Sequence, residues 1–114
     1  MSDAVIVESV RSPGARRRGS LANTRADEFG IQVLKGLLAR VPQVKPEDID
    51  DVIVGCSFPE AETGMNVGRI LAMGAGLPIS VSGMTVNRFC ASGLQAIADA
   101  TAKIRAGWSE IIIA

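Results

Sequence analysis

MTVNRFCASGLQA occupies residues 84–96 and joins two different hydrophobic patterns. Residues 84–87 form a short apolar run of strand length, whereas from Cys90 onward apolar residues recur every three to four positions until Gly107. Gly107 follows the last residue of this helical pattern, and glycine is common just after the end of a helix. The stretch therefore predicts a strand, a tight bend and a helix, with Cys90 at the junction between strand and helix.

The rest of the chain repeats this alternation of strand and helix patterns. The further expected strands are residues 4–10, 52–56 and 110–114, and the further expected helices are residues 25–40 and 65–75. Thr24, with Asp27 three positions on, resembles an N-cap for the first helix. Apolar runs without polar alternation favour strands that are buried on both faces. We therefore expect an α/β layered fold, with a mostly parallel sheet covered by helices.

Composition and charge narrow the class of protein. The 114 residues are 47% apolar and 21% charged, which suits one hydrophobic core. Twelve basic and twelve acidic residues leave no net charge, so we expect no nucleic-acid partner, and we interpret Arg16-Arg17-Arg18 as a solvated loop or a subunit contact. The sequence contains no run of about 18 apolar residues, so membrane insertion is not expected. The first residues do not have the pattern of a secretory signal. A cytoplasmic location is expected.

The cysteine and histidine content limits the possible chemistry. The chain has two cysteines and no histidine, which argues against a disulfide framework and against a metal site. At the end of an apolar run, Cys56 is expected to be buried and inert. The sequence alone does not decide whether Cys56 and Cys90 form a disulfide. Histidine is the commonest general base near neutral pH. Any nucleophile here would need such a partner from another chain or another segment.

Cys90 is the candidate nucleophile. The partial positive charge and the free N–H groups of a helix N-terminus favour a thiolate over a thiol. The small residues Ala91 and Gly93, with alanines further on, keep the helix slim enough to lie against another backbone. A free cysteine is also commonly a small buried hydrophobe. The residues alone leave both interpretations open.

Several segments of the sequence also resemble those of a known protein family. Residues 84–96 resemble the active-site segment of thiolases, the acetyl-CoA acyltransferases that cleave or form 3-oxoacyl-CoA. Residues 5–21 look like the opening strand and loop of that family. Residues 51–56, with Asn66 and Arg69, look like its second strand and the helix that follows. The resemblance covers essentially the whole chain in the right order.

The resemblance implies a reaction and a role for one residue. Cys90 matches the cysteine that becomes acylated when it attacks the ketone carbon of a 3-oxoacyl-CoA, releases acetyl-CoA and passes the acyl group to a second coenzyme A. Acyl-CoA and CoA are then substrates, with no bound cofactor, and the CoA-binding residues stay unassigned. The wording Asn87-Arg88-Phe89 is similar to the degradative, fatty-acid-oxidation branch. Many thiolases have glycine where this chain has Ala91, which implies that this position does not require a positive φ.

The resemblance also implies what surrounds the chain. Residues 1–114 would be the N-terminal thiolase-like domain, truncated before a loop domain and a C-terminal half that supply a histidine and a second cysteine. Such a fragment should show little turnover alone, and the family forms homodimers or homotetramers. Two alternatives stay open. One is another condensing enzyme of the superfamily, a ketoacyl or hydroxymethylglutaryl synthase, and the other is a non-catalytic assembly module with the same fold.

Overall fold

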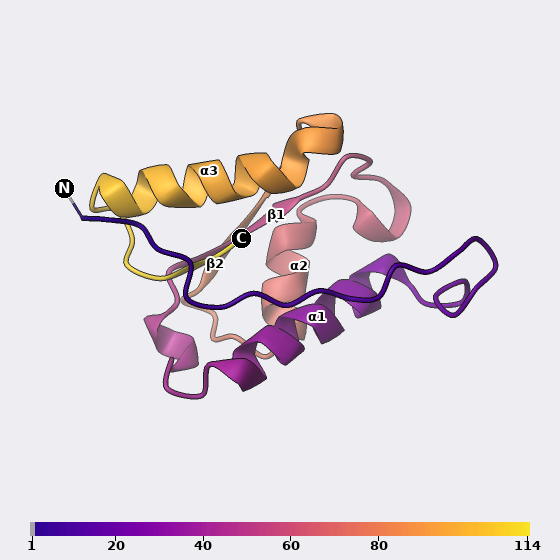
Figure 1. Ribbon diagram of the computed structural model, residues 1–114, viewed down its shortest axis with the longest axis horizontal. Helices are drawn as coiled ribbons and strands as arrows, with labels where there is room; N and C mark the ends of the chain where they lie inside the picture. The colour runs from indigo at the N-terminus through magenta and orange to yellow at the C-terminus, as the bar shows by residue number, and fades with distance from the viewer. Residues whose placement is uncertain (1) are drawn as a thin grey trace.

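The computed structural model describes residues 2–114 and has the α/β layers that the sequence predicts (Figure 1). A three-stranded parallel sheet has the order β2-β1-β3. Helix α3 covers one face of the sheet, and α2, with α1 packed against it, covers the other. The strands are β1 (Asp51–Gly55), β2 (Ser82–Val86) and β3 (Ile112–Ile113), and the helices are α1 (Ala26–Arg40), α2 (Val67–Gly74) and α3 (Ser92–Arg105). Within residues 2–114, none of the helices combines the length and hydrophobicity needed to cross a membrane.

The central strand β1 is buried on both faces, as its continuous apolar run predicts. Val52, which is 1% exposed, packs in the core formed with α1 and α2. Ile53, which is 0% exposed, packs on the opposite face against Ala96 and Ala100 of α3. Successive side chains of a strand point to opposite faces, so one short run serves both cores. The alanines of α3 confirm that this helix is slim where it meets the sheet.

Glycines end two of the helices where the sequence predicts. Gly76, with φ +85°, follows α2, and Gly107, with φ +76°, follows α3. The N–H of Leu77 donates to the carbonyl of Ala72, and the N–H of Trp108 donates to that of Lys103. Each of these donors directly follows a glycine with positive φ. The hydrogen bonds satisfy carbonyl groups in the last turn of the helix that would otherwise have no partner. A residue with a Cβ would be strained at either glycine.

The predicted N-cap of α1 is wrong. The capping position is Arg25, whose side chain makes no capping hydrogen bond, and the helix begins at Ala26. The N–H of Ala26 donates instead to the carboxylate of Glu62, at 2.8 Å and from 36 positions along the chain. Asp27 pairs with Arg25 at 3.0 Å. A distant carboxylate, which local spacing cannot reveal, therefore supplies the acceptor that we expected from Thr24.

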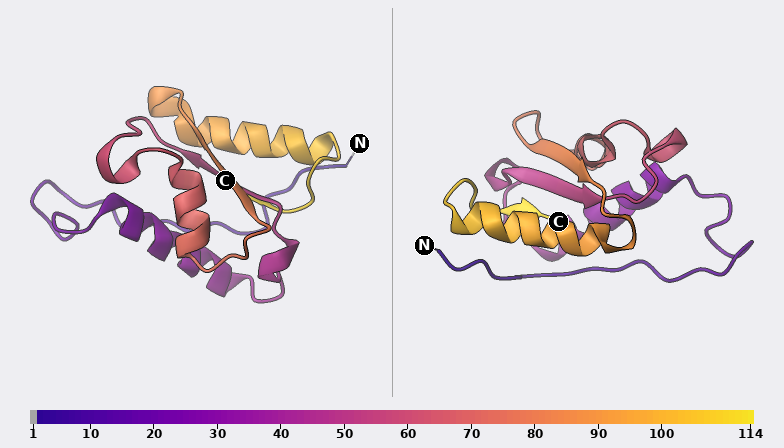
Figure 2. Two further views of the ribbon diagram at one scale, coloured as in Figure 1. Left: turned by 180° about the vertical axis from the view of Figure 1, so that it is seen from behind. Right: turned by 90° about the horizontal axis from the view of Figure 1, so that it is seen from above.

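The predicted strand at residues 4–10 is also wrong. This segment is extended but belongs to no sheet, and it runs along the molecule as a coil (Figure 2). Val5, Ile6 and Val7 are 74%, 78% and 81% exposed. β-branched residues favour strands, but a strand also needs a partner with free backbone groups. The sheet has the order β2-β1-β3, and residues 4–10 pair with neither of its edge strands, so strand propensity alone does not place them in the sheet.

A buried ion pair ties α3 to the start of β1. Asp51 is 4% exposed, and its carboxylate receives the ammonium of Lys103 at 2.5 Å. Its other oxygen accepts hydrogen bonds from the N–H of Val52 and from the hydroxyl of Ser82, each at 2.9 Å. A carboxylate in this position is tolerated because its oxygens are satisfied.

Removing the ammonium should therefore destabilise the fold. A Lys103→Met variant is expected to lose about 3 kcal/mol of unfolding free energy, because a buried charge is left without its partner. Urea denaturation followed by circular dichroism measures the loss. The matched control is Lys35→Met on the exposed side of α1, which should change stability by no more than about 0.5 kcal/mol. Equal effects in the two variants would show that the pair contributes nothing.

Candidate active site at the start of helix α3

Cys90 lies in the bend that the sequence predicts between β2 and α3. After β2 ends at Val86, the chain forms the single 3₁₀ turn η3 (Phe89–Ala91) and enters α3 directly at Ser92. Cys90 is the middle residue of η3, and its thiol is free and exposed. The sulfur is therefore open to solvent and adjacent to the first turn of a helix. This is where we expect a reactive cysteine.

The residue before Cys90 has an unusual backbone conformation. Phe89 has a φ of +46°, in the left-handed region that bulky side chains rarely adopt. Its carbonyl accepts a hydrogen bond from the hydroxyl of Ser92 at 2.6 Å and another from the hydroxyl of Ser57 at 2.6 Å. Its N–H donates to the side-chain oxygen of Asn87 at 2.9 Å. Side chains thus bind both polar groups of the Phe89 backbone, and the carbonyl also accepts the backbone N–H of Ser92.

The same side chains join neighbouring elements. The amide nitrogen of Asn87, just after β2, donates to the carbonyl of Ser57, just after β1, at 3.2 Å. The hydroxyl of Ser92, the first residue of α3, accepts the N–H of Arg88 at 2.9 Å. Since β1 and β2 are parallel, their carboxyl ends lie at one edge of the sheet, where α/β proteins commonly place their functional sites.

A glycine lets α3 approach β1 closely at this edge. A Cβ built on Gly55 would lie 2.4 Å from the carbonyl carbon of Ser92 and 2.6 Å from the nitrogen of Gly93. Ser92 itself is 3% exposed. The start of α3 therefore rests directly on the backbone of β1. Ala91 has a φ of −95°, so the expectation that this position needs no positive φ is confirmed.

Cys56 is in a different environment. It follows β1, its N–H donates to the carbonyl of Val86 at 3.0 Å, and it packs against the core formed with α1 and α2. It is only partly exposed, and both cysteines are free thiols, so no Cys56–Cys90 disulfide is present. The structure thus places Cys56 against a core and Cys90 on the surface.

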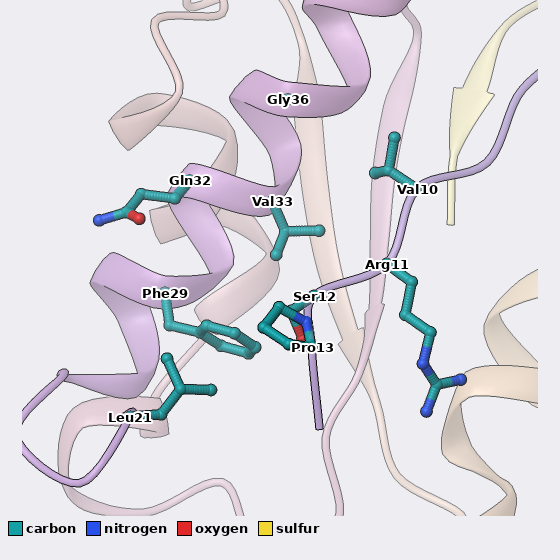
Figure 3. A pocket seen from close by; sticks show the side chains of 9 residues that line it. All are labelled: Val10, Arg11, Ser12, Pro13, Leu21, Phe29, Gln32, Val33 and Gly36. Atoms are coloured by element: carbon teal, nitrogen blue, oxygen red, sulfur yellow. The ribbon is translucent and has the colours of Figure 1, made fainter. Parts of the chain in front are cut away.

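A cavity of about 280 Å³ lies apart from Cys90. The loop after the N-terminal segment and one face of α1 line it, with Phe29 and Val33 facing Pro13 and Leu21 (Figure 3). The side chain of Arg11 points away from Phe29 and Leu21 (Figure 3). The lining is mostly apolar, and no residue of η3 belongs to it.

The fold and the site define a class of α/β proteins in which a cysteine lies at a strand-to-helix junction, at the carboxyl edge of a parallel sheet. Residues 4–114 match the family described as "Thiolase, N-terminal domain". The chain belongs to this family.

Curated relatives support the same assignment. The chain is 43% identical over its full length to the 3-ketoacyl-CoA thiolase of Idiomarina loihiensis and covers 30% of that protein. It is 46% identical over its full length to the beta-ketoadipyl-CoA thiolase of Acinetobacter baylyi and covers 28% of it. The 3-oxoadipyl-CoA/3-oxo-5,6-dehydrosuberyl-CoA thiolase of Escherichia coli is 44% identical, and the chain covers 28% of it. The chain thus spans less than a third of the length of these relatives.

Proposed function

We propose that this chain is the N-terminal domain of a thiolase-type acyltransferase, an acetyl-CoA C-acyltransferase, in which Cys90 carries the acyl group. The proposed reaction is cleavage of a 3-oxoacyl-CoA to acetyl-CoA and a shortened acyl-CoA, or the reverse condensation. The observation that carries the proposal is the free, exposed thiol of Cys90 in the turn that begins α3. Family membership and the names of the relatives support it.

The first chemical step is attack by the Cys90 thiolate on the ketone carbon of the substrate. A sulfur–carbon bond forms, the bond between the ketone carbon and the adjacent α-carbon breaks, and acetyl-CoA leaves as its enolate, which then takes a proton. In the second step the thiolate of free CoA attacks the acyl-cysteine and releases Cys90. Covalent catalysis divides a difficult carbon–carbon cleavage into two easier steps. Each step builds negative charge on an oxygen, which N–H donors near the start of α3 are suited to stabilise.

These steps need proton transfers that the 114 residues are poorly equipped to make. The chain holds no histidine, and within residues 2–114 no carboxylate or lysine side chain is hydrogen-bonded to residues 87–92. We infer that groups outside this N-terminal domain, in the remaining part of a protein as long as its relatives, supply the acid and the base. Little turnover is then expected from the 114 residues alone.

The finer assignments rest on the same family membership. We propose acyl-CoA and CoA as substrates without a resident cofactor, a degradative role in fatty-acid oxidation, a cytoplasmic location and assembly as a homodimer or homotetramer. The names of the relatives, which all end in thiolase, favour this reaction over a ketoacyl or hydroxymethylglutaryl synthase. The exposed thiol favours an enzyme over a non-catalytic assembly module with the same fold.

Competition between the two cysteines for an alkylating reagent tests the proposal. In the folded protein at neutral pH, iodoacetamide is expected to label Cys90 at least about tenfold faster than Cys56, because only Cys90 is exposed at a helix start. Peptide mass spectrometry after timed quenching gives the two rates. In urea, where both thiols are exposed, the ratio should fall to near one. Equal rates in the folded protein would contradict a nucleophilic Cys90.

A further inference from the structure

Three side chains hold the backbone of Phe89, and together they form what we call the Phe89 clamp. The clamp consists of Ser57, Asn87 and Ser92. These residues follow β1, follow β2 and begin α3, respectively, so the clamp joins all three elements that meet at Cys90. The side-chain hydrogen bonds of the three residues go to backbone groups and not to the Cys90 sulfur, so any part they have in chemistry is indirect.

The clamp explains how Phe89 keeps its φ of +46°. A bulky residue in the left-handed region is strained, and such a conformation persists only when the surrounding structure determines it. Here the hydroxyls of Ser57 and Ser92, each at 2.6 Å, and the backbone N–H of Ser92 all donate to the Phe89 carbonyl, and the side-chain oxygen of Asn87 accepts the Phe89 N–H at 2.9 Å. Loss of one of these bonds gives the peptide freedom to relax toward ordinary helical geometry.

Relaxation of Phe89 would change the orientation of the next residue. Cys90 is bonded directly to the clamped carbonyl group, so a rotation at Phe89 moves both the Cys90 N–H and its side chain relative to α3. Its sulfur would stay exposed, but its distance from the N–H groups of the helix start would change. Catalytic steps that need aligned donors are sensitive to displacements of about 1 Å.

We propose that Ser57 and Asn87 are positioning residues, which act through the Phe89 backbone to aim Cys90 and its N–H at the reacting carbonyl. The proposal rests on the proposed function of Cys90. Ser92 also donates to the Phe89 carbonyl, but it is 3% exposed and its backbone lies against Gly55, so it also serves the fold. Ser57 and Asn87 lie on partly or fully exposed loop positions, which allows them to be changed with little effect on the core.

Two reactions of the Cys90 sulfur distinguish an effect on its position from an effect on its exposure to solvent. In acyl transfer from the acetyl thioester of N-acetylcysteamine, the Cys90 sulfur bonds to the carbonyl carbon, the thioester C–S bond breaks, and the released thiolate takes a proton. This step passes through an oxyanion. Alkylation by iodoacetamide displaces iodide at a saturated carbon and forms none. The clamp should therefore affect acetylation much more than alkylation.

The experiment compares these two rates at Cys90 in the native protein. Ser57→Ala is expected to lower the rate of acetylation about tenfold while the alkylation rate stays within about twofold. Ser57→Thr, which keeps the hydroxyl, should restore acetylation to within about twofold. Asn87→Ala should act in the same direction as Ser57→Ala. Thr101→Ala is the matched control, because it also removes a hydroxyl that donates to a carbonyl, that of Ile97 at 2.8 Å, but further along α3.

The outcomes distinguish the clamp from the underlying function. If Cys90 of the unsubstituted protein is acetylated and neither Ser57→Ala nor Asn87→Ala changes that rate, the positioning role of the Phe89 clamp is overturned. The proposed function of Cys90 would then still stand. A parallel fall of acetylation and alkylation, or an equal fall in Thr101→Ala, would also overturn the positioning role, since either result indicates general loosening. If Cys90 of the unsubstituted protein is not acetylated at all, the proposed function fails first.

Discussion

A Cys90→Ala variant is expected to lose acyl transfer almost completely, by about 10⁴-fold or more, while it keeps its fold. Removal of a covalent nucleophile leaves only binding and electrostatic stabilisation, which cannot replace the missing sulfur–carbon bond. The side chain is exposed, so its truncation leaves no buried cavity, and the unfolding free energy should change by less than about 1 kcal/mol. Thiolysis of a 3-oxoacyl-CoA by the full-length protein that contains this domain, followed through loss of the substrate, measures the activity.

The control for this experiment is the other cysteine. Cys56→Ala removes a thiol that packs against the core, so it should lower stability by about 1 kcal/mol but leave acyl transfer within about threefold of the unsubstituted protein. Mass spectrometry adds a direct readout. The acyl adduct should appear on the peptide that contains Cys90 and should be absent from the Cys90→Ala variant. An adduct on Cys56, or activity that survives without Cys90, would contradict the proposed mechanism.

The sequence predicts most of the fold because its patterns are local. The spacing of apolar residues places α1, α2 and α3 to within a few positions, and the glycines at 76 and 107 mark the ends of two of them. The continuous apolar run of β1 predicts burial on both faces, which Val52 and Ile53 confirm. Each of these signals lies within one element and needs no knowledge of its neighbours.

The failures arise where an element depends on a distant partner. The β-branched residues 5–7 favour a strand, but a strand also needs a neighbour to pair with, and residues 4–10 pair with neither edge strand of the sheet. The N-terminus of α1 uses Glu62, which no local motif links to residue 26. At the site, the position of Cys90 is predictable, whereas the contribution of Ser57 is missed. Its only signal is that it follows a strand parallel to the one before Cys90, so that their ends meet at one edge.

Substitution of Gly55, at this edge of the sheet, should have a large effect on stability. In Gly55→Ala, the new Cβ would lie 2.4 and 2.5 Å from the carbonyl carbon and oxygen of Ser92. These are backbone atoms, so no side-chain rotation can relieve the clash, and α3 must move away from β1. We expect a loss of about 3 kcal/mol in unfolding free energy and a fall in Tm of roughly 10 °C. Thermal denaturation and urea titration measure both.

The matched control, Gly93→Ala, adds the same methyl group on the other side of this contact. A Cβ there meets nothing within 4 Å, and alanine has a higher helix propensity than glycine, so stability should stay equal or rise by up to about 1 kcal/mol. In Gly55→Ala, the start of α3 is displaced and Cys90 moves with it. The rate of acyl transfer to Cys90 should therefore fall more than the rate of Cys90 alkylation by iodoacetamide. If the two alanine variants were equally stable, the close approach of α3 to β1 would be wrong, and the placement of Cys90 would lose its support.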